Sequence, residues 1–243
     1  AGAGWQLLAV PGGYFQLAGY QHYSQAGDVA FATELARDWG VAVVPVSAFY
    51  HDGYDPGLVR FCFAKELVTL EAAAARMPDF TVSLVQTDLH WHDHAANRAA
   101  LAEQLAAALA GPGLTDLIVL PEMFTTGFSM AAVAQAEPGE GPTLNWLREQ
   151  AARYDAVITG SVMVTEAGRY YNRLLWVRPD GSYSAYDKRH LFRMAGEHQV
   201  YSAGAERLVE EWRGWRIQPL VCYDLRFPVW SRNLAEAPYD LLL

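Results

Sequence analysis

The segment Leu117-Ile118-Val119-Leu120 is a continuous apolar run that ends at Pro121-Glu122. A run of this kind is typical of a strand that is buried on both faces of a sheet. Helical patterns lie on both sides of it, at residues 97–109 and 144–154, and a second strand is predicted at residues 156–164. Because strands and helices alternate, this part of the sequence predicts an α/β fold built in layers.

Three ionisable side chains directly follow predicted strands. Glu122 follows the apolar run, Lys188 follows a hairpin predicted over residues 170–187, and Cys222 follows a strand predicted over residues 216–221. In layered α/β folds, the loops at the carboxyl ends of strands converge and build binding and catalytic sites. We therefore expect these three side chains to lie together.

A thiol, a carboxylate and an ammonium group complement one another chemically. A cysteine is weakly ionised at neutral pH and needs a base to become a good nucleophile. Glu122 can take that proton and return it to a leaving amine, while Lys188 can stabilise the oxyanion of a tetrahedral intermediate. The set suits acyl transfer from an amide or a nitrile without a metal. Taken singly, Cys222 also fits a small buried hydrophobe, and Glu122 and Lys188 fit solvated positions in a loop and a turn.

Residues 80–243 resemble the carbon–nitrogen hydrolase (nitrilase) superfamily and are similar to its ω-amidase branch. The motifs that carry the resemblance are Gln86-Thr87-Asp88-Leu89-x-Trp91, Pro121-Glu122-Met123-Phe124-Thr125-Thr126-Gly127-Phe128, Asp187-Lys188-Arg189-His190-Leu191-Phe192 and Cys222-Tyr223-Asp224-Leu225-Arg226-Phe227-Pro228. The resemblance implies an incomplete α-β-β-α sandwich in which Glu122, Lys188 and Cys222 are the family's Glu–Lys–Cys triad. It also implies that Glu197, in Gly196-Glu197-His198-x-x-Tyr201, is a second glutamate that orients Lys188 or the attacking water.

The resemblance implies hydrolysis of the C–N bond of a small ω-amide such as α-ketoglutaramate, through a thioester on Cys222. Glu122 would be the general base and acid, and Lys188 and the backbone N–H of Tyr223 would hold the oxyanion. The implied reactants are a small-molecule amide and water, with no metal or other cofactor, and the family's usual assembly is a homodimer. Two alternatives stay open: another amidase or carbamoyl hydrolase of the superfamily, and a catalytically inactive fusion product that carries an aminotransferase segment.

Residues 1–77 predict a small α+β unit that resembles a different family, the C-terminal small domain of class I pyridoxal-phosphate-dependent aminotransferases. The kynurenine, glutamine and methionine aminotransferase branch is the most similar. The segments that carry this resemblance are Pro11-Gly12-Gly13-Tyr14-Phe15-Gln16-Leu17, residues 41–46 and Val59-Arg60-Phe61-Cys62-Phe63-Ala64-Lys65. The resemblance implies that Arg60 matches the arginine that grips the substrate α-carboxylate, although Arg60 also fits an exposed or ion-paired position. We expect neither pyridoxal phosphate binding nor transamination, because the large domain is missing and Lys65 is not its Schiff-base lysine.

The segment Met77-Pro78-Asp79-Phe80 looks like a natural protein start that runs into a strand. We therefore predict two joined coding units: an aminotransferase fragment, residues 1–77, and a truncated hydrolase domain, residues 78–243. Glutamine transamination yields α-ketoglutaramate, which ω-amidases hydrolyse, so the pairing would join consecutive reactions. The chain ends at Leu241-Leu242-Leu243, an apolar run for which we expect no partner, and this end predicts a fragment.

The composition of the 243 residues excludes several classes of protein. The 18 basic and 27 acidic residues give a net charge of -9, which argues against a nucleic-acid binder. Apolar residues make up 52%, enough for a sizeable core, yet no run reaches the roughly 18–20 residues of a membrane span. Two distant cysteines, Cys62 and Cys222, make no disulfide framework, and no basic signal peptide precedes an apolar run. These features favour the cytoplasm.

Two further groups of residues have more than one interpretation. The segment His90-Trp91-His92-Asp93-His94 places three histidines at alternate positions, a pattern that also fits a zinc site. We prefer a surface loop, because the triad needs no metal. In the first segment, Cys62 lies between two phenylalanines and predicts a core position. The same prediction applies to the aromatic residues Tyr14, Phe15, Phe61 and Phe63.

Overall fold

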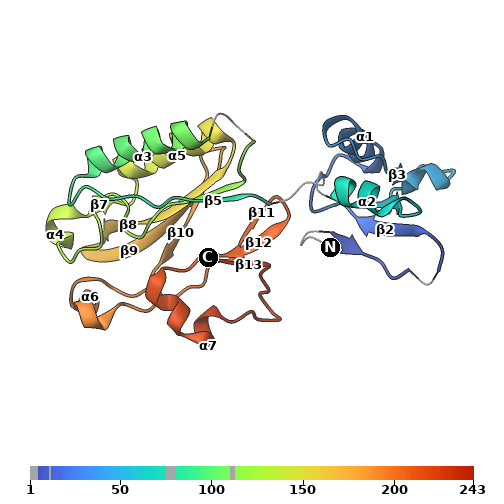
Figure 1. The fold of residues 1–243 in the computed structure, drawn as a ribbon. Coiled ribbons are helices and arrows are strands. Elements are labelled where there is room, and N and C mark those ends of the chain that lie inside the picture. Colours follow the sequence, from blue (N-terminus) through green and yellow to red (C-terminus); the bar gives the residue numbers. More distant parts are fainter. Residues whose placement is uncertain (1–4, 11, 75–79, 110–112) are drawn as a thin grey trace. The chain divides into compact units, whose positions relative to one another are not determined.

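The computed structural model describes residues 5–10, 12–74, 80–109 and 113–243, and it divides into two compact units (Figure 1). The first unit comprises residues 1–79 with residues 213–215, and the second comprises residues 80–212 and 216–243. The join predicted at Met77 lies outside the described residues. None of the described helices combines the length and the apolar character that crossing a bilayer requires.

The second unit is built on a mixed sheet whose strand order is β10-β9-β8-β6-β5. Strands β5, β6 and β8 run parallel, whereas β9 and β10 are antiparallel to their neighbours and form the predicted hairpin. A short strand, β7, pairs with the far end of β8. The bounds are β5 Val82–Leu84, β6 Leu117–Val119, β7 Glu137–Pro138, β8 Val157–Glu166, β9 Arg169–Val177 and β10 Tyr183–Asp187.

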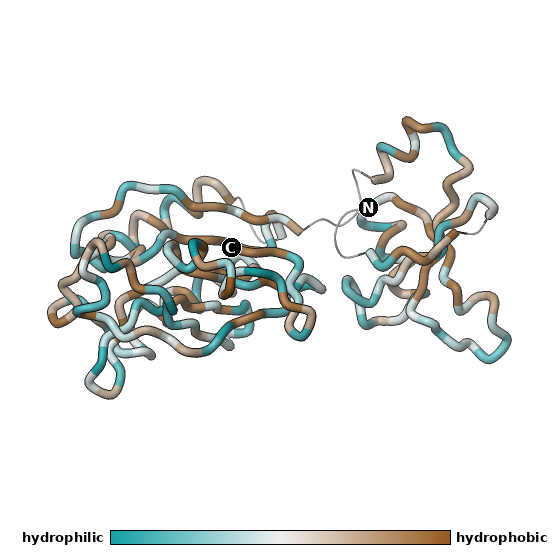
Figure 2. Tube along the Cα trace, turned by 90° about the horizontal axis from the view of Figure 1, so that it is seen from below, coloured by the Kyte–Doolittle hydropathy of each residue, from teal (hydrophilic) through white to brown (hydrophobic). Residues whose placement is uncertain are grey.

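A smaller sheet, of order β11-β12-β13, belongs to the same unit. Its strands are β11 Glu210–Trp212, β12 Trp215–Gln218 and β13 Leu241–Leu242. The expectation that Leu241–Leu243 has no partner is wrong, since β13 pairs in parallel with β12 and the Leu220 N–H donates to the Leu243 carbonyl at 3.0 Å. The apolar trace at the C terminus in Figure 2 is thus a paired strand. Because β12 and β13 are distant in sequence, no local pattern reveals this pairing.

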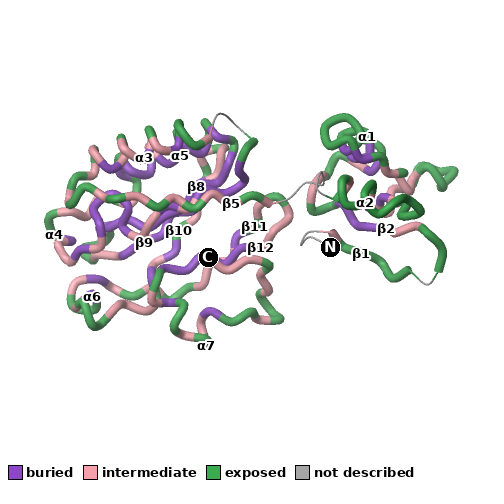
Figure 3. Tube along the Cα trace, viewed as in Figure 1, coloured by how far each residue is buried: buried purple, intermediate pink, exposed green. Residues whose placement is uncertain are grey.

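Two helices cover one face of the large sheet: α3 (His94–Ala108) and α5 (Pro142–Tyr154). Helix α3 begins earlier than predicted because the Asp93 carboxylate accepts a hydrogen bond from the Ala96 N–H at 2.9 Å, which makes Asp93 the N-cap. Helix α5 begins at Pro142, a residue well suited to the first helical position. Figure 3 shows both helices with exposed outer turns and buried positions toward the sheet.

The central strands of the large sheet, β6 and β8, are buried on both faces, as the apolar run predicts. One face packs on the helices, in a core that includes Leu101, Leu147, Ile118, Ile158 and Leu175. The other face and the segments after β12 and β13 line a common cavity, whose walls include Val119, Thr159, Leu174, Leu220 and Leu243. The layers are therefore helix, sheet and sheet, which confirms the predicted α/β fold of nitrilase type.

The remaining helices of the second unit are short. Helix α7 begins at Pro228, because proline starts a helix readily, and it ends at Ser231, because the backbone at Arg232 is extended. The bounds are α4 Ala132–Gln135, η2 Arg193–Ala195, α6 Glu197–Val200, η3 Cys222–Arg226 and α7 Pro228–Ser231. Three of them, η2, α6 and η3, lie close in sequence to the residues of the candidate site.

The first unit is a small α+β structure, as predicted. Its antiparallel sheet has the order β1-β2-β4-β3, and helix α1 packs on β3 and β4. Tyr20, Phe31, Leu35 and Val59 form its buried core. The bounds are β1 Gln6–Leu7, β2 Phe15–Gly19, α1 Asp28–Asp38, β3 Val44–Pro45, η1 Val46–Phe49, β4 Leu58–Cys62 and α2 Leu67–Ala74.

Some of the core positions predicted for the first unit are wrong. Cys62 is exposed, Tyr14 is 54% exposed and Phe63 is 40% exposed. Strand β4 explains the first of these, because alternate residues of a strand point to opposite faces. Val59 and Phe61 face the core, so Cys62 turns away from it.

Candidate active site

Glu122 lies in the turn after β6, and this turn is fastened to the neighbouring strand β8. The Ser161 hydroxyl accepts a hydrogen bond from the Met123 N–H at 2.9 Å, and the Ser161 carbonyl accepts one from the Phe124 N–H at 3.2 Å. The turn approaches β8 closely at Gly160, where an added Cβ would lie 2.8 Å from the Cβ of Leu120. The backbone of β8 thus fixes the position of the Glu122 side chain.

The structure brings Glu122, Lys188 and Cys222 together, as their positions after strands predict. Lys188 follows β10, and its Nζ lies 2.7 Å from Glu122 Oε1. Cys222 begins η3, close enough to Glu122 for the charge of that carboxylate to raise the pKa of the thiol. Glu122 and Cys222 both line the small cavity between the two sheets, which has a volume of about 110 Å³.

Lys188 is buried and held by two carboxylates. Its side chain is 1% exposed, and that of Glu197 is 0% exposed. Lys188 Nζ lies 3.0 Å from Glu197 Oε2, and the same Oε2 accepts a hydrogen bond from the Phe192 N–H at 2.5 Å. Burial disfavours the charged form of Lys188, but the charges and hydrogen bonds of the two carboxylates outweigh burial and raise its pKa. Lys188 is therefore an ammonium ion at neutral pH.

Asn172 on β9 is a member of this cluster that the sequence reasoning missed. Its Nδ2 donates to Glu122 Oε1 at 2.8 Å and to Glu197 Oε1 at 3.0 Å. Strand alternation is the signal that would have found it, because Asn172 shares a face with the buried residues Leu174 and Trp176. A lone amide among such residues needs a polar partner.

Cys222 lies at the start of a tight turn that a buried carboxylate stabilises. The φ angle of Cys222 is 44°, which is uncommon for a residue with a Cβ. Asp224 Oδ2 accepts a hydrogen bond from the Val221 N–H at 3.3 Å, just before the cysteine. Burial, followed by the negative charge of Glu122, raises the pKa of the Cys222 thiol, although Lys188 acts in the opposite direction. The resting group is therefore a thiol that needs a base.

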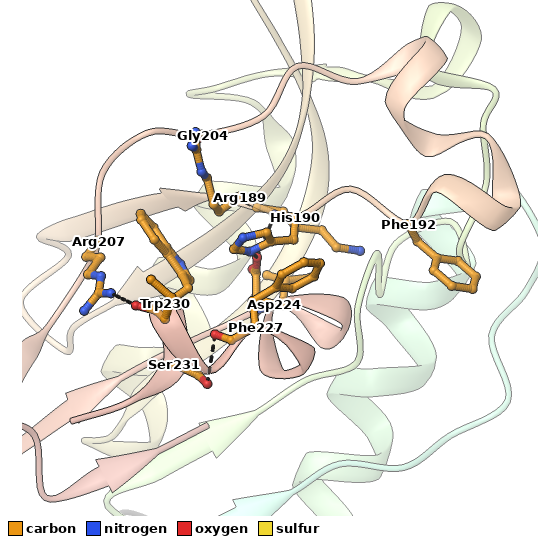
Figure 4. A network of polar contacts seen from close by, with 12 residues as sticks. Arg189, His190, Phe192, Gly204, Arg207, Asp224, Phe227, Trp230 and Ser231 are labelled. Atoms are coloured by element: carbon orange, nitrogen blue, oxygen red, sulfur yellow. Dashed lines mark hydrogen bonds and ion pairs between the residues drawn. The ribbon is translucent and has the colours of Figure 1, made fainter.

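Hydrogen bonds and ring contacts around Asp224 stabilise the turn that Cys222 begins (Figure 4). Asp224 Oδ1 accepts from the His190 N–H at 2.7 Å and lies 2.9 Å from His190 Nδ1. Tyr186 Oη donates to Asp224 Oδ2 at 2.8 Å. The His190 ring stacks on Phe227 with a centroid distance of 3.7 Å. These contacts join the loop after Lys188 to the turn that Cys222 begins, so they fix the positions of the two segments relative to each other.

Tyr223, predicted to supply a backbone oxyanion donor, is the second residue of η3. The first N–H groups of a helix have no partner within the helix and are available to other acceptors. The Tyr223 ring packs edge-on against Phe192 and Phe227, at centroid distances of 5.1 and 5.2 Å. Its role as a donor stays a prediction.

Residues 81–243 match the family model of carbon-nitrogen hydrolases. The chain belongs to this family. It is 52% identical over 167 residues to the omega-amidase YafV of Yersinia enterocolitica, with 69% of this chain and 62% of that protein covered. It is 35% identical over 121 residues to the 2-oxoglutaramate amidase of Bacillus subtilis, with 49% of this chain and 47% of that protein covered. The chain thus spans less than two thirds of the length of these hydrolases.

The fold is also similar to a solved carbon-nitrogen hydrolase. The crystal structure of a CN-hydrolase superfamily protein of Xanthomonas campestris, with an arsenic adduct in its active site, superposes with a TM-score of 0.65 at 52% identity. That similarity covers 68% of this chain and 64% of the other. A relative of another kind is the methionine aminotransferase of Escherichia coli, 42% identical over 72 residues, or 30% of this chain and 19% of that protein.

Arg60, the predicted carboxylate-binding residue, belongs to the first unit, whereas Glu122, Lys188 and Cys222 belong to the second. Its guanidinium lies between two aromatic rings, 4.1 Å from the centroid of Phe15 and 4.6 Å from that of Phe49. Its Nε is buried and has no hydrogen-bond partner among the described residues. Arg60 is therefore neither exposed nor ion-paired there; it is stacked between rings.

The three histidines of residues 90–94 have separate contacts in the hydrolase unit. His92 Nε2 lies 2.8 Å from the Ser129 hydroxyl, and His94 Nδ1 lies 2.9 Å from Glu137 Oε1. The His90 N–H donates to the Asn97 side chain at 2.7 Å. Across the described part of the chain, no group of three or more His, Cys, Asp or Glu side chains has an arrangement that would hold a metal ion.

Proposed function

We propose that the second unit hydrolyses the terminal amide of a small ω-amide of a keto acid, such as α-ketoglutaramate. The observation that carries this proposal is the contact of one buried ammonium, Lys188, with two carboxylates beside the Cys222 thiol. The proposal is supported by relatives that are named omega-amidase and 2-oxoglutaramate amidase. The alternative is another amide or a carbamoyl group as substrate, because the same site chemistry would cleave it.

In the first half of the proposed reaction, the thiol proton of Cys222 moves to Glu122 as the sulfur attacks the amide carbon. A C–S bond forms, and the carbonyl oxygen becomes an oxyanion. Lys188 Nζ has three N–H groups, and the two carboxylates leave one of them for the oxyanion, together with the Tyr223 N–H. The C–N bond then breaks, and ammonia leaves with the proton that Glu122 returns.

In the second half, water hydrolyses the thioester. Glu122 takes a proton from the water as its oxygen attacks the thioester carbon, and the C–S bond breaks. The proton on Glu122 returns to the sulfur, and the keto acid leaves and loses its remaining carboxyl proton to the solvent at neutral pH. Glu197 keeps Lys188 in place throughout, because its own Oε2 is fixed by the Phe192 N–H.

General base catalysis follows from the state of the thiol. A raised pKa means that Cys222 is protonated at neutral pH, so the nucleophile forms only as its proton is removed. Glu122 lines the same small cavity as that thiol, and its charge acts on the thiol pKa. A pre-formed thiolate would need the positive charge of Lys188 to dominate, whereas here burial and the Glu122 charge outweigh it.

For the first unit we infer descent from an aminotransferase small domain, with residues 1–77 as the matching segment. A 42% identity over 72 residues to a methionine aminotransferase supports this. We propose no transamination and no pyridoxal phosphate binding, because the only lysine of residues 1–77, Lys65, is exposed on the segment after β4. A cytoplasmic location and a homodimeric hydrolase unit complete the proposal.

Ammonia release tests the proposed function. The purified full chain is incubated with α-ketoglutaramate and, separately, with glutamine, which has the same amide but an amino group in place of the keto group. We expect ammonia from α-ketoglutaramate alone. Release from neither substrate, by a chain whose near-ultraviolet circular dichroism shows ordered packing, would overturn the proposal. Equal release from both would favour a general amidase.

A further inference from the structure

Asn172 contacts each of the three charged residues in the centre of the hydrolase site. Its Nδ2 donates to Glu122 Oε1 at 2.8 Å and to Glu197 Oε1 at 3.0 Å. Its backbone carbonyl accepts a hydrogen bond from the Lys188 N–H at 2.9 Å. Side chain and backbone of one residue therefore reach both carboxylates and the lysine that they share.

The charges around Asn172 explain why an amide suits this position. Two carboxylates face a single ammonium, so the buried cluster has one more negative than positive charge. Each N–H of the amide can serve one carboxylate, and hydrogen bonds to ionised groups are stronger than those between neutral groups. Asn172 thus offsets part of the excess negative charge without adding a charge of its own.

The other end of the Asn172 side chain shows that its donors are what the site uses. The side chain is completely buried, and Asn172 Oδ1 has no hydrogen-bond partner among the described residues. An unpaired buried oxygen destabilises the fold. A residue with a purely structural role would have hydrogen-bond partners for both the N–H groups and the oxygen of its amide. Here the N–H groups are paired with the two carboxylates, and the oxygen is left without a partner.

We propose that Asn172 is a positioning residue of the hydrolase site. Its amide donates one hydrogen bond to Glu122 and one to Glu197, which keeps both carboxylates directed at Lys188. This rests on the proposed function only in that Glu122 is the base. Other titratable groups that face the cluster are the Cys222 thiol and the Tyr201 phenol, which feels the charge of both carboxylates.

The variant Asn172→Ala removes both donors and is measured without substrate. Protein labelled with ¹³C at the glutamate carboxyl groups is titrated by NMR, and Glu122→Gln and Glu197→Gln assign the two signals. In Asn172→Ala we expect the carboxyl pair to take up a proton at a pH roughly one unit higher than in the unsubstituted chain, because one charge-assisted hydrogen bond per carboxylate is lost. If turnover is measurable, the acid limb of kcat/KM should move in the same direction.

Asn97 provides a matched control. It is also a buried asparagine, and its Nδ2 also donates two hydrogen bonds, to the His90 and Thr125 carbonyls at 2.7 Å each. These acceptors are neutral, so Asn97→Ala should lower stability and leave the carboxyl titration unchanged. The proposal would be overturned if Asn172→Ala changed the pH at which the carboxyl pair takes up a proton by no more than Asn97→Ala does.

A second measurement uses the unsubstituted chain and so does not depend on whether a variant folds. In the unsubstituted chain, the side-chain ¹H–¹⁵N signals of Asn172 should move as the carboxyl pair titrates, whereas those of Asn97 should not. If the Asn172 signals kept the same chemical shifts throughout the titration, the proposal would also be overturned. Neither readout uses an amide substrate, so a failed ammonia assay would count against the proposed function and not against the role of Asn172.

Discussion

Each unit of the chain holds a cation beside an aromatic ring, but the two cations have different partners. Lys188 in the second unit is 1% exposed and contacts two carboxylates, with the Phe128 ring 5.5 Å away. Arg60 in the first unit lies between two phenylalanine rings, and no ion pair to it is found among the described residues. The ammonium of the hydrolase site is paired with two carboxylates of its own unit, whereas Arg60 has no carboxylate partner among the described residues.

The two cysteines differ in the same way. Both are exposed, but Cys222 starts a tight turn and lines a small cavity with Glu122, whereas Cys62 ends strand β4. In the proposed reaction, an exposed thiol is a nucleophile only where a base lies beside it. Pairs of matched variants, one in each unit, can break or sharpen this contrast.

The largest expected difference is between Cys222→Ala and Cys62→Ala. Without the nucleophile no thioester forms, so hydrolysis of α-ketoglutaramate should fall by about 10⁴-fold or more in Cys222→Ala. Cys62→Ala should leave the rate within about twofold, since surface substitutions away from a site have small effects. Steady-state ammonia release measures both. Near-normal turnover by Cys222→Ala would contradict the assignment.

The next contrast is between Lys188→Met and Arg60→Met, which each replace a cation by an apolar side chain of similar length. Lys188→Met leaves the buried Glu197 and the partly buried Glu122 without a cation, so it should lower the free energy of unfolding of the second unit by about 3–5 kcal/mol and abolish hydrolysis. Arg60→Met should cost the first unit about 1 kcal/mol, the size of a partly exposed cation–π contact, and leave hydrolysis unchanged. Urea unfolding and ammonia release together give both values, and equal losses would remove the contrast.

A smaller contrast concerns two carboxylates with similar partners. Asp224 accepts from Tyr186 Oη at 2.8 Å and from backbone N–H groups, and Asp55 in the first unit accepts from Tyr20 Oη at 2.6 Å and from two backbone N–H groups. Asp224→Asn should destabilise the second unit by about 1–3 kcal/mol and slow hydrolysis, because it loosens the Cys222 turn. Asp55→Asn should not affect hydrolysis. A rate equally insensitive to both would show that Asp224 is only structural.

The pH dependence of the first unit has a definite sign. Burial opposes ionisation of Asp55, but its hydrogen bonds from Tyr20 and the backbone outweigh burial, and its pKa is lowered. A carboxyl group whose pKa is lower in the folded than in the unfolded chain stabilises the fold at pH values above its unfolded pKa. This stabilisation by Asp55 is lost as the pH falls below about 4 and the carboxylate takes up a proton. Asp55→Asn should therefore flatten the acid side of the stability profile, as measured by thermal unfolding between pH 3 and pH 6.

The smallest expected effect is a change in the alkylation rate of Cys222 in Glu122→Gln. It distinguishes the role of Glu122 as a base from its effect on the reactivity of the thiol. Burial and the negative charge of Glu122 raise the pKa of Cys222. Glu122→Gln removes that charge, so the thiol pKa falls and iodoacetamide should alkylate Cys222 faster at neutral pH, although turnover is lost. The measurement uses a Cys62→Ser background, so that one thiol is counted. Slower alkylation in Glu122→Gln would mean that Glu122 promotes a resting thiolate.

The three-residue centre was predictable because Glu122, Lys188 and Cys222 each follow a strand directly, and strand ends converge in a layered fold. Asn172 lies within a strand, where its role depends on which face meets the second sheet. The partner of Leu241–Leu243 is equally non-local, since β13 pairs with a strand more than twenty residues earlier in the sequence. Cys62 was misplaced for a related reason: strand alternation predicts two faces but not which of them is covered.

The covalent intermediate on Cys222 tests the central claim most directly. The full chain is mixed with α-ketoglutaramate, quenched in acid within the first turnovers and digested, and the two cysteine-containing peptides are weighed by mass spectrometry. We predict an acyl group from the substrate on the Cys222 peptide, none on the Cys62 peptide, and one ammonia released for each acyl group in the first turnover. Ammonia release without any adduct on Cys222, or an adduct on Cys62, would contradict the account.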